Sequence, residues 1–423
     1  MQSIRKKILP DVFLTHYPAT KFKNSLLSIQ LVFPLDAAFA SANALFPAVL
    51  RRGTARYTDM RSISSALDAL YGASIAYTVR KKGENQCVGF VGSFIDDAFT
   101  LGGERLLEPV AKLMGEILLD PVVREGCFLS EYAAGEKENL ADAIRSVIND
   151  KREYADMRLL QEMCKGERYA VDRLGDEESL SRLDARTLYA HYQKAIASAR
   201  VEVFYCGSAD ISRVEDALEA ALSGLPRGSV IAPAVAVRRA VRETPLHVTE
   251  AMDVTQGKLS MGFRCTSEDT AAMTLCNTMF GGSSNSKLFL NVREKLSLCY
   301  FASSIYHRAK NIVTLSSGIE FENYQLAFDE IMEQLGAMRR GEWEDWELDG
   351  ARSTIMTAYK TMDDSISRTE EFHLGAVATD LPDTPDELMR KIAEVTPERI
   401  RAAAESIQLD SVYFLTGKEG ADE

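Results

Sequence analysis

The chain repeats its own order of structural elements, and this internal repeat constrains the fold more than any other feature of the sequence. Residues 70–75 match residues 300–305 at a shift of about 230 residues. Residues 183–207 match residues 395–417 in the same way, near the end of each copy. Because 423 residues also exceed one ordinary core, we expect two homologous halves.

Both halves have the pattern of an α+β fold. Runs with alternating apolar residues predict strands, and longer runs with helical spacing predict helices, in the same order in each half. Such an order is typical of a mostly antiparallel sheet covered by long helices. Apolar periodicity fails from Pro226 to Pro245, which predicts an N-terminal half at 1–225, a linker at 226–245 and a C-terminal half at 246–423. The expected strands are 26–33, 73–80, 86–95, 201–206, 258–263 and 300–306, and the expected helices are 41–50, 59–70, 99–119, 125–148, 154–164, 184–195, 270–280 and 286–295.

A loop of small residues precedes the most informative helix of the second half. The loop contains Gly281, Gly282, Ser283 and Ser284, a composition that lets a backbone approach a ligand closely. Ser286 suits the N-cap of the helix that follows. Three apolar residues lie four apart on one face of this helix, Leu288, Val292 and Leu296.

Arg293 and Tyr300 lie near the end of this helix and the start of the next strand. A planar donor group and a phenol at one rim are suited to holding a peptide carbonyl or an oxyanion. Each residue also has a purely structural interpretation. An Arg near a helix C-terminus interacts favourably with the helix dipole, and a Tyr at the start of a strand commonly packs. Taken alone, the two residues leave both interpretations open.

The whole stretch from residue 281 to residue 300 resembles a signature of the insulinase/pitrilysin family of zinc peptidases, in the branch that contains the mitochondrial processing peptidases. That signature is Gly-Gly, a short polar stretch, Ser-Lys/Arg-Leu-Phe, Arg-Glu-Lys, Leu and Tyr. The resemblance implies that Arg293 and Tyr300 bind substrate, together with the loop that precedes them. It covers nearly the whole chain and implies the same architecture of two halves.

The zinc motif of this family is absent where the resemblance places it. The family has an inverted H-x-x-E-H five residues before a Gly-Thr pair, with two His as zinc ligands and a Glu that activates water. Counting back from Gly53 puts Ala44 and Ala48 at the ligand positions and Pro47 at the position of the base. None of these side chains can bind zinc or move a proton. Pro47 should also kink the helix or delay its start if Ser41 is the cap.

The third ligand of the family is a Glu more than seventy residues further on. Glu136 belongs to a stretch that resembles the residues before this ligand, and the position seven residues later is Ala143. No other motif compensates, because the five His lie far apart and His191 has the pattern of a packed or surface residue. The resemblance therefore implies no catalytic residue and no metal ligand in this chain.

Composition excludes some partners. The formal net charge of -13 argues against nucleic-acid binding and anionic membranes, which require clustered Lys and Arg. The first thirty residues lack the apolar core of a signal peptide, and no run approaches about 18 apolar residues, so a cytoplasmic chain is expected.

The hypothesis that follows is a catalytically inactive subunit of a heterodimeric zinc peptidase. By resemblance to family members, including bacterial pairs of one intact and one degenerate chain, a homologous partner would supply the zinc site and this chain the Arg293/Tyr300 substrate site. The ligand would be an extended peptide or protein, and the chain alone would be able to form a homodimer. Two alternatives remain open: a structural or assembly protein on the same fold, and an active metallopeptidase with a non-standard site.

Overall fold

The computed structural model describes residues 3–418 and divides the chain into two compact units. Unit 1 contains the chain up to Arg145 together with Val171–Val235 and Ser365–Leu381. Unit 2 contains Ser146–Ala170, Ala236–Asp364 and the chain from Pro382 onward. Each unit therefore takes one short segment from the sequence half that forms the body of the other.

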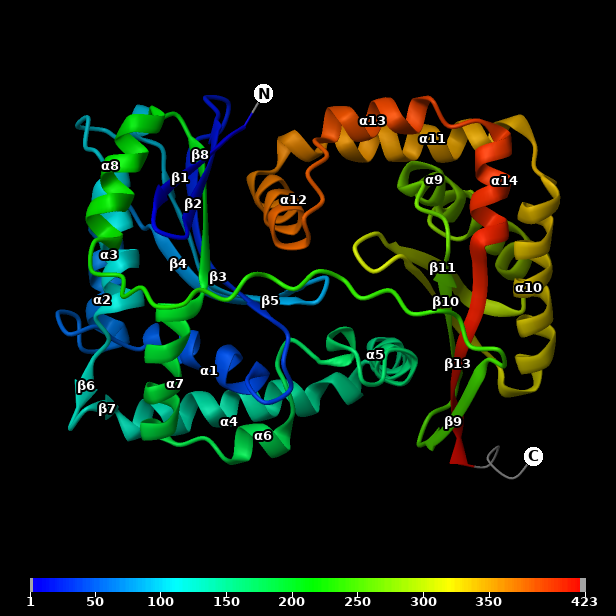
Figure 1. The fold of residues 1–423 in the computed structure, drawn as a ribbon, viewed down its shortest axis with the longest axis horizontal. Coiled ribbons are helices and arrows are strands. Elements are labelled where there is room, and N and C mark those ends of the chain that lie inside the picture. Colours follow the sequence, from blue (N-terminus) through cyan, green and yellow to red (C-terminus); the bar gives the residue numbers. More distant parts are fainter. Residues whose placement is uncertain (1–2, 419–423) are drawn as a thin grey trace. The chain divides into compact units, whose positions relative to one another are not determined.

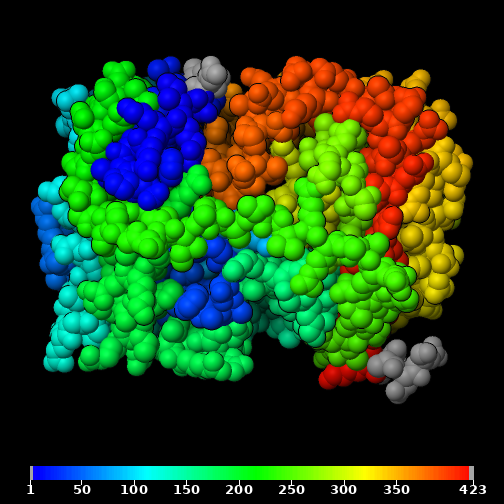
Figure 2. Space-filling model, viewed as in Figure 1, coloured from blue at the N-terminus to red at the C-terminus, as the bar shows by residue number. Residues whose placement is uncertain are grey.

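Unit 1 is organised by a six-stranded sheet in the order β1-β2-β8-β3-β5-β4 (Figure 1). All neighbouring strands are antiparallel except β2 and β8, which are parallel. Figure 2 shows the β1–β2 hairpin, in dark blue, on the surface of this unit. The strands are β1 (Ile4–Leu9), β2 (Val12–Pro18), β3 (Asn24–Pro34), β4 (Ser74–Lys82), β5 (Asn85–Ile95) and β8 (Arg200–Gly207), and a separate short hairpin comprises β6 (Val123–Arg124) and β7 (Cys127–Phe128).

Unit 2 has a five-stranded sheet in the order β11-β12-β10-β13-β9. Here too a single neighbouring pair, β13 and β9, is parallel. The order matches β4-β5-β3-β8-β2 of unit 1 strand for strand, so the predicted two homologous α+β halves are confirmed. The strands are β9 (Leu246–Met252), β10 (Gly257–Cys265), β11 (Cys299–His307), β12 (Ile312–Ile319) and β13 (Ile407–Gly417).

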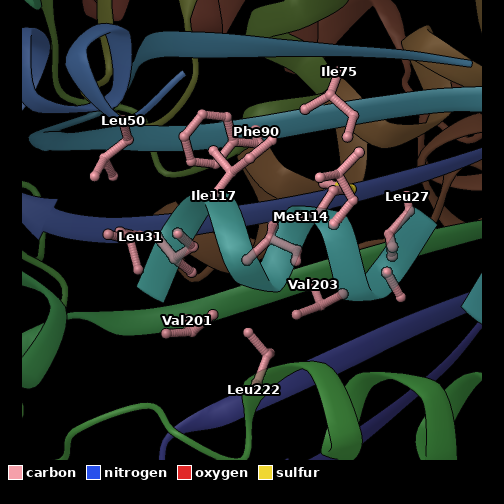
Figure 3. Packing of buried hydrophobic residues seen from close by; sticks show 14 of the residues in the cluster. Leu27, Leu31, Leu50, Ile75, Phe90, Met114, Ile117, Val201, Val203 and Leu222 are labelled. Atoms are coloured by element: carbon pink, nitrogen blue, oxygen red, sulfur yellow. The ribbon is translucent and has the colours of Figure 1, made fainter. Parts of the chain in front are cut away.

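Helices cover both faces of the unit 1 sheet. Met114 and Ile117 of α3 pack against the sheet residues Leu27 and Leu31, and Leu222 of α8 joins the same core (Figure 3). Burying a side chain of this size contributes about 1.5–3 kcal/mol. The helices of unit 1 are α1 (Ala40–Leu50), α2 (Met60–Asp68), α3 (Leu107–Leu119), α4 (Ser130–Ser146), α6 (Glu177–Ser181), α7 (Ala185–Ser198), α8 (Ile211–Leu222) and α12 (Ile366–Thr379).

The helices of unit 2 cover its sheet in the same manner. Phe263 and Leu315 of the sheet and Phe280 of α9 belong to one core cluster, which also includes residues of α10 and α14. Besides the π-helix described below, the helices of this unit are α5 (Lys151–Met163), α9 (Thr270–Phe280), α10 (Tyr324–Arg340), α11 (Asp345–Lys360), α13 (Pro385–Ala393) and α14 (Pro397–Ser406).

Two helices belong to the unit of the opposite sequence half. Leu374 of α12 packs on Val32 of β3, whose side chain points away from the core that contains Leu31. In unit 2, Leu159 of α5 packs on Tyr413 of β13 in the corresponding way. Successive side chains of a strand point to opposite faces of the sheet. Because the exchanged helices cover the second face, the side chains on both faces are buried.

Most expected elements lie within a few residues of the observed ones. The helix expected at 125–148 begins only at Ser130, because Cys127 and Phe128 form β7. The helix expected at 99–119 begins only at Leu107, because Gly103 has a positive φ of 76° and Asp97–Phe99 form a separate 3₁₀ helix. The hairpin of β1 and β2 was not predicted. Residues 225–245 contain neither helix nor strand, and these include the predicted linker.

Candidate functional site

Arg293 lies on a helix of unusual winding. Leu288–Lys295 form a π-helix, and the amide of Leu296 donates to the carbonyl five residues earlier at 3.1 Å. π-Helices are rare in proteins, and those that occur often lie at functional sites. Leu288 and Val292 are buried. Leu296 is 43% exposed, because it lies just beyond the last helical residue.

The start of the π-helix is anchored by a buried ion pair. Lys287 is its N-cap, one residue after the predicted Ser286. The ammonium group of Lys287 lies 3.1 Å from a carboxylate oxygen of Glu347 on α11, and both side chains are at most 10% exposed. Ser286 also stabilises the start of this helix, since its hydroxyl accepts a hydrogen bond from the amide of Phe289 at 3.4 Å. The helix that bears Arg293 is therefore held at its first residue.

Tyr300 is the extra residue of a β-bulge on β11, an edge strand of the unit 2 sheet. Cys299 pairs with Ile319 of β12, whereas Phe301 pairs with Gly318, so Tyr300 has no partner of its own. Bulges often re-aim a side chain next to a functional site. The Tyr300 side chain is 61% exposed, and its hydroxyl donates to Oε1 of Glu320 at 2.7 Å.

Arg293 and Tyr300 line one cavity of about 400 Å³. The guanidinium of Arg293 lies 3.5 Å from the carboxylate of Glu294 and 4.6 Å from the ring centre of Phe289. These are its contacts among residues 3–418, and neither occupies the guanidinium N–H groups with a close hydrogen bond. The remaining residues that line the cavity are Glu294, Ser297, Leu298, Cys299 and Glu320.

Charge within the cavity is mixed. Arg293 contributes one positive charge, and Glu294 and Glu320 contribute two negative charges. The pKa of Tyr300 is raised, first by its hydrogen bond to Glu320 and then by the charge of that carboxylate. Burial raises the pKa of Cys299, so its thiol stays protonated and unreactive at neutral pH. The cavity is suited to hold a polar ligand and contains no activated nucleophile.

The predicted loop packs closely against its neighbours, and its four residues are not among those that line this cavity. A Cβ on Gly281 would lie 2.6 Å from the hydroxyl oxygen of Ser304 and 2.9 Å from its backbone nitrogen. A Cβ on Gly282 would lie 2.9 Å from Cα of Thr278. Ser283 donates to the carbonyl of Thr278 at 3.2 Å, and Ser284 is exposed. The glycines therefore let the loop fit closely against β11 and α9.

Replacing Gly281 with Ala should destabilise unit 2 by about 1–3 kcal/mol, because the new methyl group collides with the backbone of β11. The matched control is Gly135→Ala within α4, where a Cβ meets no atom within 4 Å. That change should stabilise the protein by up to about 1 kcal/mol through helix propensity. Urea unfolding of both variants measures the two effects, and equal effects would contradict the packing role of Gly281.

The helix that corresponds to the zinc-motif helix is α1, and it is buried along its whole length. Ala44 and Ala48 are 2% and 6% exposed, and Pro47 lies inside the helix. The expectation that Pro47 delays the start of the helix was wrong. The helix begins at Ala40, before Ser41, whose hydroxyl instead bonds to the backbone of the loop before α6.

Ala143 lies on α4 and is exposed. On the same helix, Glu136 pairs with Arg52, which follows α1, at 3.0 Å. This ion pair occupies the carboxylate that precedes the position of the third zinc ligand. In residues 3–418, no group of three or more His, Cys, Asp or Glu side chains is arranged to hold a metal ion.

Comparison with known proteins identifies the family. Residues 182–355 match a family model described as the peptidase M16 inactive domain. The chain is also 33% identical over 405 residues to the probable inactive metalloprotease YmfF of Bacillus subtilis, with 95% of each chain covered. The chain belongs to the M16 peptidase family. The resemblance to insulinase/pitrilysin-type peptidases is thereby confirmed, and the chain is an inactive, M16-type peptidase-like protein.

Solved structures show the same M16-like fold over the whole chain. A conserved protein from Enterococcus faecalis V583 superposes with a TM-score of 0.90 at 25% identity, covering 98% of this chain and 99% of that one. A peptidase M16 inactive domain from Pseudomonas fluorescens superposes with a TM-score of 0.79 at 16% identity, with 99% of each chain covered. The second likeness is one of fold alone.

In this M16 chain, His191 of α7 packs against the degenerate helix. Its Nε2 lies 2.7 Å from Oδ1 of Asn43, and its ring stacks on Phe39 with 5.6 Å between ring centres. Because the amide oxygen can only accept, Nε2 carries the hydrogen. Asn43 in turn donates to Gln86 at 3.0 Å. Of the two alternatives expected for His191, a packed or a surface residue, these contacts favour the packed one.

Acid should destabilise unit 1 through His191. Burial, and then the charge of Lys194, lower the pKa of His191 to about 4. The unfolded chain, with an ordinary pKa of about 6.5, binds a proton there that the folded chain excludes, so the free energy of unfolding falls as pH falls from about 6.5 to 4. The loss should reach up to about 3 kcal/mol.

Urea unfolding of His191→Gln between pH 7 and pH 4.5 tests this prediction, because Gln keeps a donor for Asn43 and removes the titration. The variant should lose less stability in acid than the parent. The control is Gln193→Ala on the exposed side of α7, which removes no titrating group and should keep the pH profile of the parent. A parent-like profile for His191→Gln would contradict the prediction.

Within the described residues of this M16 chain, no helix is long and apolar enough to cross a membrane.

Proposed function

We propose that this chain is the non-catalytic subunit of a heterodimeric M16 peptidase in the cytoplasm. Its partner would be a homologous chain with an intact H-x-x-E-H motif, which supplies the zinc ion and the base that activates water. This chain would contribute Arg293 and Tyr300 to a composite active site. The observation that carries the proposal is that both residues line one cavity, which Arg293 enters with unused hydrogen-bond donors.

The position of Tyr300 suggests how substrate binds. β11 is paired with β12 on one side, and its other side is an edge of the unit 2 sheet. Extended peptides commonly add to sheet edges through backbone hydrogen bonds. A substrate beside the start of β11 would bring one of its peptide groups to Tyr300 and Arg293. These residues would then hold and orient that group. Positioning of this kind can lower the activation free energy of a reaction by a large amount.

Reconstitution tests the proposal. The chain alone should cleave no peptide, and the zinc-bearing homologue alone should cleave slowly. An equimolar mixture should form a heterodimer and cleave a fluorogenic peptide library about 100-fold faster than the homologue alone, because the mixture completes the site. If the homologue forms no complex with this chain, or cleaves equally well without it, the chain has another role, such as assembly.

A further inference from the structure

The proton of the Tyr300 hydroxyl is already used inside the cavity. The hydroxyl donates to Oε1 of Glu320 at 2.7 Å. A phenol has one hydrogen to donate and acceptor lone pairs besides. The bond to a carboxylate is charge-assisted and about twice as strong as a bond to a neutral carbonyl. A peptide carbonyl would therefore not displace Glu320, and Tyr300 presents an acceptor to a ligand.

The backbone places Glu320 beside Tyr300. β12 ends at Ile319, which pairs directly with Cys299, and Glu320 is the next residue along the chain. Tyr300 is likewise the residue after Cys299, and the bulge turns it out of the ladder. The two side chains thus leave neighbouring strands at the same point. The register of the sheet therefore places the two residues next to each other.

Arg293 has the opposite hydrogen-bonding character. A guanidinium group has only donors. The guanidinium of Arg293 lies 3.5 Å from the Glu294 carboxylate and 4.6 Å from the ring centre of Phe289, so its N–H groups make no close hydrogen bond. The cavity therefore offers a donor from Arg293 and an acceptor from Tyr300. A peptide backbone carries the complementary pair of groups, a carbonyl that accepts and an amide that donates.

We propose that Glu320 is a positioning residue that sets the direction of the Tyr300 hydrogen bond. With Glu320 in place, an extended peptide binds through a carbonyl held by Arg293 and an amide N–H accepted by Tyr300. This inference rests on the proposed function, because it assumes that the cavity binds a peptide. Beyond that function, Arg293 recognises a backbone carbonyl, Tyr300 recognises a backbone amide, and Glu320 determines the choice at Tyr300.

Amide-to-ester substitution tests the inference, since an ester lacks the N–H group. The probes are fluorescein-labelled peptides about ten residues long that cover the sequence of β-casein. The tightest binder to the full-length chain is resynthesised with one ester at a time. On the parent, one ester should weaken binding about fivefold, the effect of one lost hydrogen bond. On Tyr300→Phe, which has no acceptor, that ester should bind as well as its amide.

Glu320→Gln supplies a readout that a merely structural role would not change. Removing the carboxylate should lower the pKa of Tyr300 towards the ordinary value of about 10, measured by NMR of ring-labelled tyrosine with Tyr300→Phe for assignment. The same variant should reduce the fivefold effect of the critical ester. An unchanged Tyr300 pKa and an unchanged ester effect would overturn the role of Glu320.

Two outcomes separate this inference from the proposed function. If casein peptides bind and Arg293→Gln weakens them, but no ester effect depends on Tyr300, then the inference is wrong and the peptide site stands. If no peptide binds the full-length chain, alone or with its homologue, then the proposed function fails and the inference fails with it.

Discussion

Glu167→Gln is expected to destabilise unit 2 by about 3–5 kcal/mol, because it removes one carboxylate charge from a buried cluster of ion pairs. The Glu167 carboxylate lies 2.6 Å from the ammonium of Lys310 and 2.8 Å from the guanidinium of Arg264. Lys310 is fully buried, and Arg264 is 6% exposed. Gln has nearly the same shape as Glu, so the loss would measure the missing charge rather than a cavity.

The wider cluster explains why one change should matter so much. Asp410 is fully buried and pairs with Arg264 at 3.1 Å and with Arg242 of the segment before β9. Lys310 also donates to the carbonyl of Val237 in that segment. Burial alone would raise the pKa of Glu167, but its hydrogen bonds and ion pairs with Lys310 and Arg264 lower that pKa overall. The cluster thus links three parts of unit 2: the sheet, the segment before β9 and the residues that follow α5.

Equilibrium unfolding in urea measures the effect of Glu167→Gln. The matched control is Glu394→Gln, which removes one partner of an exposed ion pair with Arg390 in the same unit. No measurable change is expected there, since exposed pairs contribute little. A stability of Glu167→Gln within about 1 kcal/mol of the parent would mean that water or another group compensates the buried cations.

Arg293→Ala should lower kcat/KM of the reconstituted pair about 100-fold, because it removes charged donors from the substrate's peptide group. Tyr300→Phe should cost less, about fivefold to tenfold, because only a neutral acceptor is lost. Initial rates on a fluorogenic peptide measure both effects. Native gel filtration should show unchanged complexes, since neither side chain is needed for packing of the unit 2 core.

Lys295→Ala is the control for this pair of variants. Lys295 is the last residue of the same π-helix, is exposed and does not line the cavity. Its removal changes the charge of the helix by the same amount and should leave kcat/KM within about twofold. If Arg293→Ala and Tyr300→Phe leave cleavage at the parent rate while the complex forms, substrate positioning is wrong.

The fold could be predicted largely from the repeat. Apolar alternation at residues 26–33 predicted β3, and the matching residues 258–263 predicted β10, because a buried strand needs such side chains in any context. The exchange of helices could not be predicted. The apolar faces of α5 and α12 would suit either sheet, and a one-dimensional pattern does not say which sheet each helix covers.

The candidate site was predicted in part. Arg293 and Tyr300 came from the resemblance of residues 281–300, and the structure brings them to one cavity. Glu320 was missed, since its contact with Tyr300 depends on strand register and on a bulge. The π-helix was missed because its spacing is close to that of an α-helix over a few residues.

Native mass spectrometry with metal analysis, on the tagged chain recovered from its own cells, tests the central claim most directly. The expected result is a one-to-one complex with a homologue of similar size that carries an H-x-x-E-H motif and a single zinc ion. Recovery of the chain only as a metal-free monomer or homodimer would contradict the composite peptidase and favour an assembly role. Stoichiometric zinc on the isolated chain would contradict the loss of the metal site at Ala44, Pro47, Ala48 and Ala143.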